Sequence, residues 1–128
     1  MSLDGKTDLT ARVIGAAIEV HKHLGAGFKE KTYGNALMIE LRLQGISAER
    51  QLPVELDYKD ESIGEGVIDI LVEGTLVVEL KAIDAIHDAH KNQVLAYLKA
   101  IDQPVGLLLN FHAPRMAEGV RRVVNEAS

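Results

Sequence analysis

Two acidic residues and one lysine stand in otherwise apolar surroundings in the middle of the chain. Asp69 interrupts one apolar run, and Glu79 and Lys81 flank Leu80 in a second one. Charged groups within apolar strands are costly to bury unless they are paired or bind a metal. Two carboxylates offer the oxygen ligands that Mg²⁺ prefers, and a lysine beside them can assist an attacking water or stabilise charge on a phosphate. These residues therefore predict hydrolysis assisted by a hard divalent cation, Mg²⁺ or Mn²⁺.

This chemistry requires the two carboxylates to meet on one side of a sheet. Side chains alternate along a strand, so Glu79 and Lys81 share a face. Asp69 is opposite Glu79 only if the strands are joined by a three-residue loop, 73–75, with its glycine at the centre; a two-residue turn would pair Asp69 with Val78 instead. The alternative is that the three charges form an ion-pair group on an exposed sheet face and carry no chemistry.

Helices and strands are expected on both sides of this segment. Apolar residues recur at helical spacing in the ranges 8–24, 29–44 and 86–101. Period-two alternation or continuous apolar runs predict strands over 52–58, 67–72, 76–82 and 105–110. A turn is expected at 60–62, and the segment 118–125 is compatible with either a strand or a helix.

The order of these elements predicts an α/β fold with a mixed sheet and two N-terminal helices. Three consecutive strands form a meander, and a helix then crosses over to a fourth strand, 105–110, which is covered on both faces. A chain of 128 residues, 47% of them apolar, suits one such unit. We therefore expect a single domain over residues 1–128.

Several motifs, taken in order along the chain, resemble one known family. Gly27, Glu30 and Tyr33 form the pattern G-x-x-E-x-x-Y. The later matching segments are Ile68–Glu73, Val77–Ala82, His90–Leu98 and Gly106–Phe111. Over residues 9–125 the chain resembles the GxxExxY family, a branch of the PD-(D/E)XK nuclease superfamily. The resemblance implies a restriction-endonuclease-like core and a nuclease that acts on phosphodiester bonds of DNA or RNA.

The resemblance also implies roles for individual residues. Asp69 and Glu79 would be metal ligands, and Lys81 would be the catalytic lysine. Glu30 would be an additional acid near the metal. Gln93 would be the glutamine that faces the site from the helix after the E-x-K motif.

Three further residues are candidates for contact with a substrate. His90 and Tyr97 lie on the same helical face as Gln93. Tyr33 is expected to be a core residue whose hydroxyl reaches the site. One departure from the family is Val67, which stands two residues before the aspartate, where the family tends to have arginine.

Composition limits the partners that the chain can have. A net charge of -5 is unusual for a nucleic-acid binder, because phosphate neutralisation by Lys and Arg supplies much of the affinity. It favours the alternative function, a non-catalytic module with the same fold that binds nucleic acid or a protein. The absence of cysteine excludes a disulfide scaffold and a thiolate zinc site.

The chain shows no apolar run long enough to cross a membrane and no signal peptide. We therefore expect no membrane partner and a cytoplasmic location. A homodimer is a further expectation, because a short chain offers little surface for gripping a duplex and dimers are the commonest oligomers.

Overall fold

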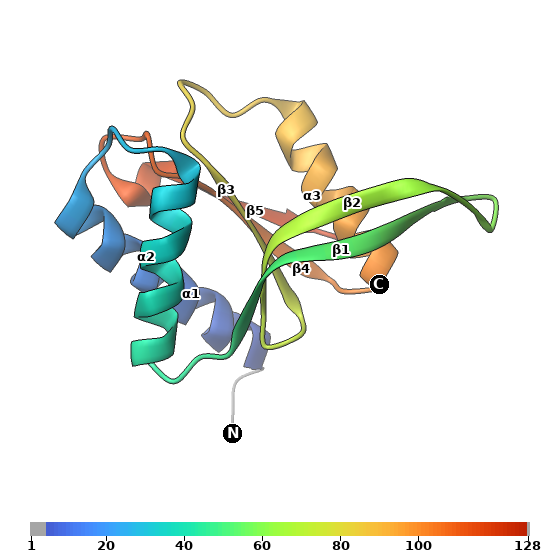
Figure 1. Ribbon diagram of the computed structural model, residues 1–128, viewed down its shortest axis with the longest axis horizontal. Helices are drawn as coiled ribbons and strands as arrows, with labels where there is room; N and C mark the ends of the chain where they lie inside the picture. The colour runs from blue at the N-terminus through green and yellow to red at the C-terminus, as the bar shows by residue number, and fades with distance from the viewer. Residues whose placement is uncertain (1–4, 128) are drawn as a thin grey trace.

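The elements follow one another in the predicted order (Figure 1). The computed structural model describes residues 5–127. The elements in this range are α1 (Gly5–Leu24), α2 (Glu30–Leu43), β1 (Ala48–Tyr58), β2 (Glu61–Val72), β3 (Leu76–Lys81), α3 (Asp88–Ile101), β4 (Val105–Asn110), η1 (Met116–Gly119) and β5 (Val120–Val124). The segment 118–125, which the sequence left open, thus contains the end of a 3₁₀ turn and a strand. None of the helices described has the length and apolar character needed to cross a bilayer.

The strands form a five-stranded mixed sheet in the order β1-β2-β3-β4-β5. The pair β3–β4 is parallel and the other three pairs are antiparallel. The helix α3 connects the two parallel strands, as a parallel pair requires. Residues 106–110 of β4 are all buried, which confirms the prediction of a strand covered on both faces.

Helices cover both faces of the sheet. Figure 1 shows α1 and α2 on one side and α3 on the other. On β3, Val78 and Leu80 pack with α1 and α2, whereas Val77 packs with α3. The alternation of side chains along this strand therefore divides the apolar core into two layers.

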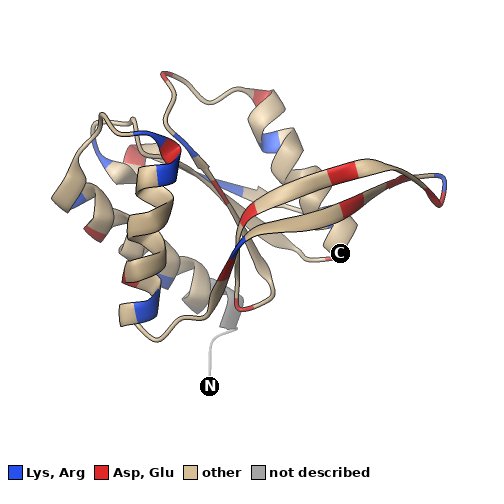
Figure 2. Ribbon diagram, in the orientation of Figure 1, with Lys and Arg blue, Asp and Glu red and all other residues tan. Residues whose placement is uncertain are grey.

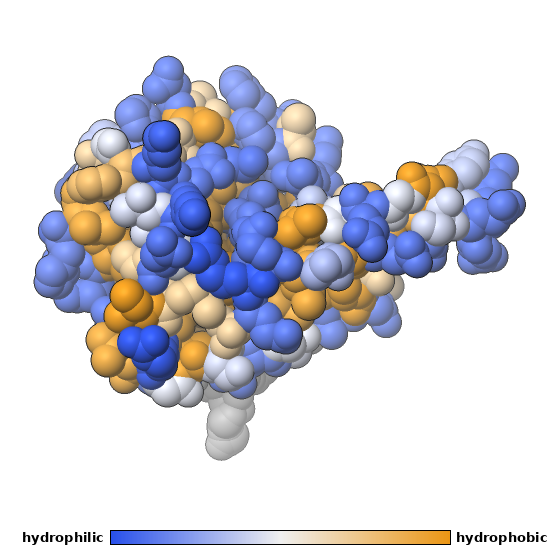
Figure 3. All heavy atoms as spheres, in the orientation of Figure 1, coloured by the Kyte–Doolittle hydropathy of each residue, from blue (hydrophilic) through white to orange (hydrophobic). Residues whose placement is uncertain are grey.

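The β1–β2 hairpin is longer than the sequence predicts. Its turn is at Lys59 and Asp60, whose φ angles of 52° and 68° are those of a two-residue hairpin turn, and not at 60–62. Residues 61–66 are mostly polar or glycine and give no apolar alternation, although they pair with β1. The outer part of the hairpin, residues 55–65, projects from the body as an arm (Figures 1 and 3).

The arm is predominantly acidic. Figure 2 shows acidic residues along both of its strands. They are Glu55, Asp57, Asp60, Glu61 and Glu65, and they outnumber the single Lys59 of this segment. Five acids against one lysine mean that most of the net charge of -5 lies on the arm, whereas acidic and basic residues nearly balance in the body.

Candidate active site

The β2–β3 hairpin has the predicted register. Ile70 pairs with Val78, and the loop consists of residues 73–75 with its glycine at φ 70°. Extending this register by one position places Asp69 opposite Glu79. The pairing itself ends at Ile70, and beyond this point β2 and β3 diverge (Figure 1).

Asp69 lies where the side chains of β2 change direction. Ile70 packs with α1 and α2, whereas both Leu71 and Ile68 pack with α3. Regular alternation would place Ile68 and Ile70 on the same face, so the strand is rotated at Asp69. On the neighbouring strand β1, Gln51 has a left-handed φ of 53° at the same level. The carboxylate is thereby turned out of the regular sheet pattern.

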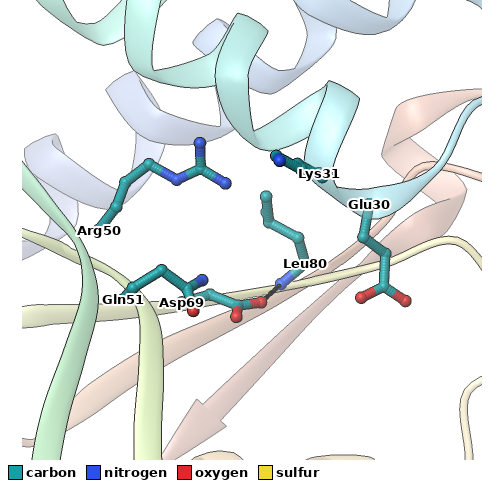
Figure 4. A pocket seen from close by; sticks show the side chains of 6 residues that line it. All are labelled: Glu30, Lys31, Arg50, Gln51, Asp69 and Leu80. Carbon is teal, nitrogen blue, oxygen red and sulfur yellow. Dashed lines mark hydrogen bonds between the residues drawn. The ribbon is translucent and has the colours of Figure 1, made fainter.

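The Asp69 carboxylate bridges to β3 at the open end of the hairpin. Its Oδ2 accepts a hydrogen bond of 2.9 Å from the backbone N–H of Leu80 (Figure 4). The last ladder pair is Ile70–Val78, so this side-chain bond continues the link between the two strands just beyond the end of the ladder. It holds the carboxylate against the strand that carries Glu79 and Lys81.

Glu79 is a buried acid whose charge is only partly compensated by its neighbours. The residue is 6% exposed, and its Oε1 has no hydrogen-bond partner among the described residues. The Nζ of Lys81 lies 3.9 Å from Oε2. Burial raises the pKa of Glu79 to about 7; the charges of Asp69 and Glu30 add to this rise, and Lys81 opposes it. Glu79 and Lys81 thus form the ion pair of the alternative interpretation, but not on an exposed face, because Glu79 is not at the surface.

A cavity of about 530 Å³ opens beside these residues (Figure 4). It is lined by Glu30, Lys31, Arg50, Gln51, Asp69 and Leu80. In Figure 4 the Glu30 side chain extends from the start of α2 toward the sheet. The charges of Asp69, Lys81 and Glu30 act on the pKa of Glu79, so the three predicted acids and the predicted lysine lie near one another. Glu79 and Lys81 do not line the cavity.

The family model described as the PD-(D/E)XK nuclease superfamily matches residues 7–123. The chain belongs to the PD-(D/E)XK nuclease superfamily. Residues 79–81 read Glu-Leu-Lys, the form (D/E)-X-K that the name of the superfamily contains, and Asp69 is preceded by Ile68 and not by proline. A comparison with curated proteins gives no match. PD-(D/E)XK nucleases generally depend on a divalent metal, and membership of the superfamily indicates a nuclease-like protein.

Tyr33 is a core residue of this PD-(D/E)XK chain, as expected, but its hydroxyl bonds the loop before α2. Its side chain is fully buried and stacks on Phe111, with ring centroids 4.5 Å apart. Its hydroxyl donates to the carbonyl of Gly25 and accepts from the N–H of Phe28. Both bonds hold the loop before α2, and Tyr33 does not line the cavity; its contact with a substrate stays a prediction.

Two of the other candidate residues, Tyr97 and His90, take part in the packing and the N-terminal structure of α3. Tyr97 is buried in the layer under α3, with its ring against Gly66. His90 Nδ1 accepts a hydrogen bond of 2.9 Å from the backbone N–H of His87 at the start of α3. Tyr97 does not line the cavity, and its contact with a substrate stays a prediction. His90 is only half-buried, and Gln93 is exposed on α3; neither lines the cavity.

The sequence reasoning missed the cavity residues Arg50, Gln51 and Lys31. The strand was expected to begin at Leu52, so Arg50 was not placed on it. With the strand beginning at Ala48, Arg50 lies on β1, but it contacts α2 whereas Leu52 packs with α3. The alternation is therefore broken at Gln51, and period two gives no signal for Arg50. The left-handed backbone at Gln51 had no sequence signal.

Asn110, which lies outside the cavity lining, is a further residue that sequence reasoning missed. It is buried at the end of β4, directly beside Lys81 in the parallel ladder. Its Oδ1 accepts from the N–H groups of Ile83 and His112, and its Nδ2 donates to the Ile83 carbonyl. The amide therefore fixes the chain that leaves β3, the strand that carries Glu79 and Lys81.

Proposed function

We propose that the chain is a divalent-metal-dependent nuclease of the GxxExxY branch that hydrolyses phosphodiester bonds in DNA or RNA. The observation that carries this proposal is the buried, unpartnered Oε1 of Glu79 at the open end of the β2–β3 hairpin. A carboxylate in this position is costly without a cation. Asp69 lies on the neighbouring strand β2, one position beyond the last paired residue, Ile70.

The residues present fit a hard cation such as Mg²⁺ or Mn²⁺. The candidate ligands are carboxylate oxygens, and Mg²⁺ is commonly bound by one or two carboxylates, with water and substrate oxygens completing its ligands. Within residues 5–127 no group of three or more His, Cys, Asp or Glu side chains forms a ready metal site. Asp69 and Glu79 would therefore be the protein ligands, with Glu30 close enough to raise the pKa of Glu79.

A bound divalent cation supplies positive charge that activates water and offsets the charge developing on the phosphate. The chain contributes the rest. The Leu80 N–H orients the Asp69 carboxylate. Lys81, half-buried beside Glu79, can hold the attacking water or stabilise the phosphate. Gln93 is proposed to help position the substrate from α3, and His90 stands one turn earlier on the same helix.

The test combines cleavage with metal binding. Wild type should cut plasmid, single-stranded DNA or RNA in Mg²⁺ or Mn²⁺, and Asp69→Asn and Lys81→Met should each lower the rate by at least about a hundredfold. Arg122→Ala, at the far edge of the sheet, is the matched control and should retain activity. Calorimetric titration should show metal binding by wild type that is lost in Asp69→Asn. Variants that cut as fast as wild type would refute the proposal.

The acidic balance of the chain supports a second function, a non-catalytic module. A net charge of -5, with an acidic arm, gives little general attraction for a polyanion. Such a module would bind nucleic acid or a protein partner without cutting any of the substrates.

We also propose that the chain forms a homodimer. Light scattering on the same preparations measures whether it does.

A further inference from the structure

Arg50 is a half-buried cation without an acidic partner. None of the ion pairs among the described side chains includes it. Within residues 5–127 its side chain makes one hydrogen bond, from Nη1 to Oδ1 of Asn35, and its buried Nε has no partner there. A guanidinium has five N–H donors, so most of its hydrogen-bonding capacity is unused. A charged group in such a state is stabilised by an anion.

Two consecutive residues of α2 hold the guanidinium in place. A Cβ at Gly34 would overlap Nη2 of Arg50, so only glycine leaves the space that the guanidinium occupies. The next residue, Asn35, accepts from Nη1. Figure 4 shows the side chain reaching from β1 toward α2 across the cavity. Arg50 is therefore held at a defined position on the cavity wall.

The cavity lining carries charges of both signs, with Glu30 and Asp69 acidic and Lys31 and Arg50 basic. The Asp69 carboxylate is fixed on the sheet by the Leu80 N–H, while Arg50 and Lys31 are the basic residues of the lining. A cation bound by the acids would leave the cavity with net positive charge. The planar guanidinium presents donors in the geometry that phosphate oxygens accept.

We infer that Arg50, seated on Gly34 and Asn35, binds a phosphate of the nucleic-acid strand next to the one that is cut. This inference rests on the proposed nuclease function and adds the residue that grips the strand. Lys31, exposed at the start of α2, is a second cation on the same wall. The assignment gives an otherwise acidic chain a local phosphate contact.

The experiment measures binding of a short labelled single strand and its duplex, with Ca²⁺ in place of Mg²⁺, over a range of salt concentrations. Arg50→Ala should weaken binding about tenfold and reduce the slope of log affinity against log salt by about 1. Gly34→Ala keeps the charge but displaces the guanidinium, and should weaken binding in the same direction. Arg122→Ala removes an exposed arginine at the opposite edge of the sheet and should bind as wild type.

The outcomes separate this inference from the nuclease proposal. If wild type binds and cuts, and Arg50→Ala and Gly34→Ala match Arg122→Ala, the inference is wrong and the proposed function stands. Weaker binding with an unchanged salt slope and a lowered melting temperature would identify Arg50 as a structural link between β1 and α2, which also overturns it. If wild type neither binds nor cuts any nucleic acid with metal, both proposals fail.

Discussion

The Glu79 carboxyl loses solvation on folding, and this has consequences for stability. Its pKa is about 7 in the folded protein and 4.5 in its ordinary state. Between these values the folded protein holds the proton and the unfolded chain releases it. The stability that this group contributes is complete below pH 4.5 and is lost as the pH rises through about 7.

We therefore predict that Glu79→Gln stabilises the metal-free protein by about 2 kcal/mol near pH 8, because the amide carries no charge to desolvate. The difference from wild type should shrink toward pH 4.5. Urea denaturation in the presence of a chelator measures it at both ends. Glu126→Gln, which changes an exposed acid, is the control. A variant less stable than wild type at high pH would show that the folded protein compensates the charge.

Asn110 is the second residue whose chemistry can be tested alone. Asn110→Ala removes an acceptor of two backbone N–H groups and a donor to one carbonyl, all next to the strand that carries Lys81. We predict a loss of about 2 kcal/mol in the free energy of unfolding, because buried backbone groups lose their partners. Thermal or urea unfolding checks this. Full stability in the variant would mean that water replaces the amide.

At the scale of elements, the position of α3 depends on glycine. A Cβ on Gly66 of β2 would lie 2.5 Å from Cε1 of Tyr97, whose ring is buried under α3. We predict that Gly66→Ala destabilises the protein by about 1–3 kcal/mol through overpacking. Gly15→Ala is the matched control, since a Cβ in the middle of α1 meets no atom within 4 Å. It should be neutral or stabilising by about 0.5–1 kcal/mol. Equal effects of the two changes on unfolding would contradict this packing.

The sequence predicts the elements well where periodicity is strong. The two N-terminal helices, the crossover helix and the apolar strand β4 are confirmed, since each buries a continuous apolar stripe or run. The β2–β3 register is confirmed because the loop glycine fixes the turn length. The arm was missed because strands that leave the core need no apolar alternation. Its turn at Lys59 and Asp60 uses residues without a distinctive turn signal.

Part of the candidate site was also visible in the sequence. Asp69, Glu79 and Lys81 are recognisable because an isolated charge in an apolar strand is rare. The part played by Tyr33 was not visible, because the partners of a hydroxyl are set by tertiary structure. The rotation of β2 at Asp69 was not predicted, because no residue type in this segment indicates it.

At the scale of the whole molecule, net negative charge complicates any test of metal binding. A chain with a charge of -5 and an acidic arm attracts divalent cations to its surface in general. Binding to a defined site must therefore be separated from weak binding elsewhere. Because a ligand that binds only the folded state stabilises it, unfolding measures the specific site.

We predict that Mg²⁺ at about 100 times its Kd raises the stability of wild type by about 2.7 kcal/mol. The gain should be larger at pH 8 than at pH 5.5, because Glu79 must lose its proton to bind the cation. Asp69→Asn and Glu79→Gln should lose the Mg²⁺-dependent gain, even though the second variant is the more stable one without metal. Glu55→Gln, which removes a charge from the arm, should keep it. If the arm variant loses the gain and the two site variants keep it, the cation binds the acidic surface and not the end of the β2–β3 hairpin.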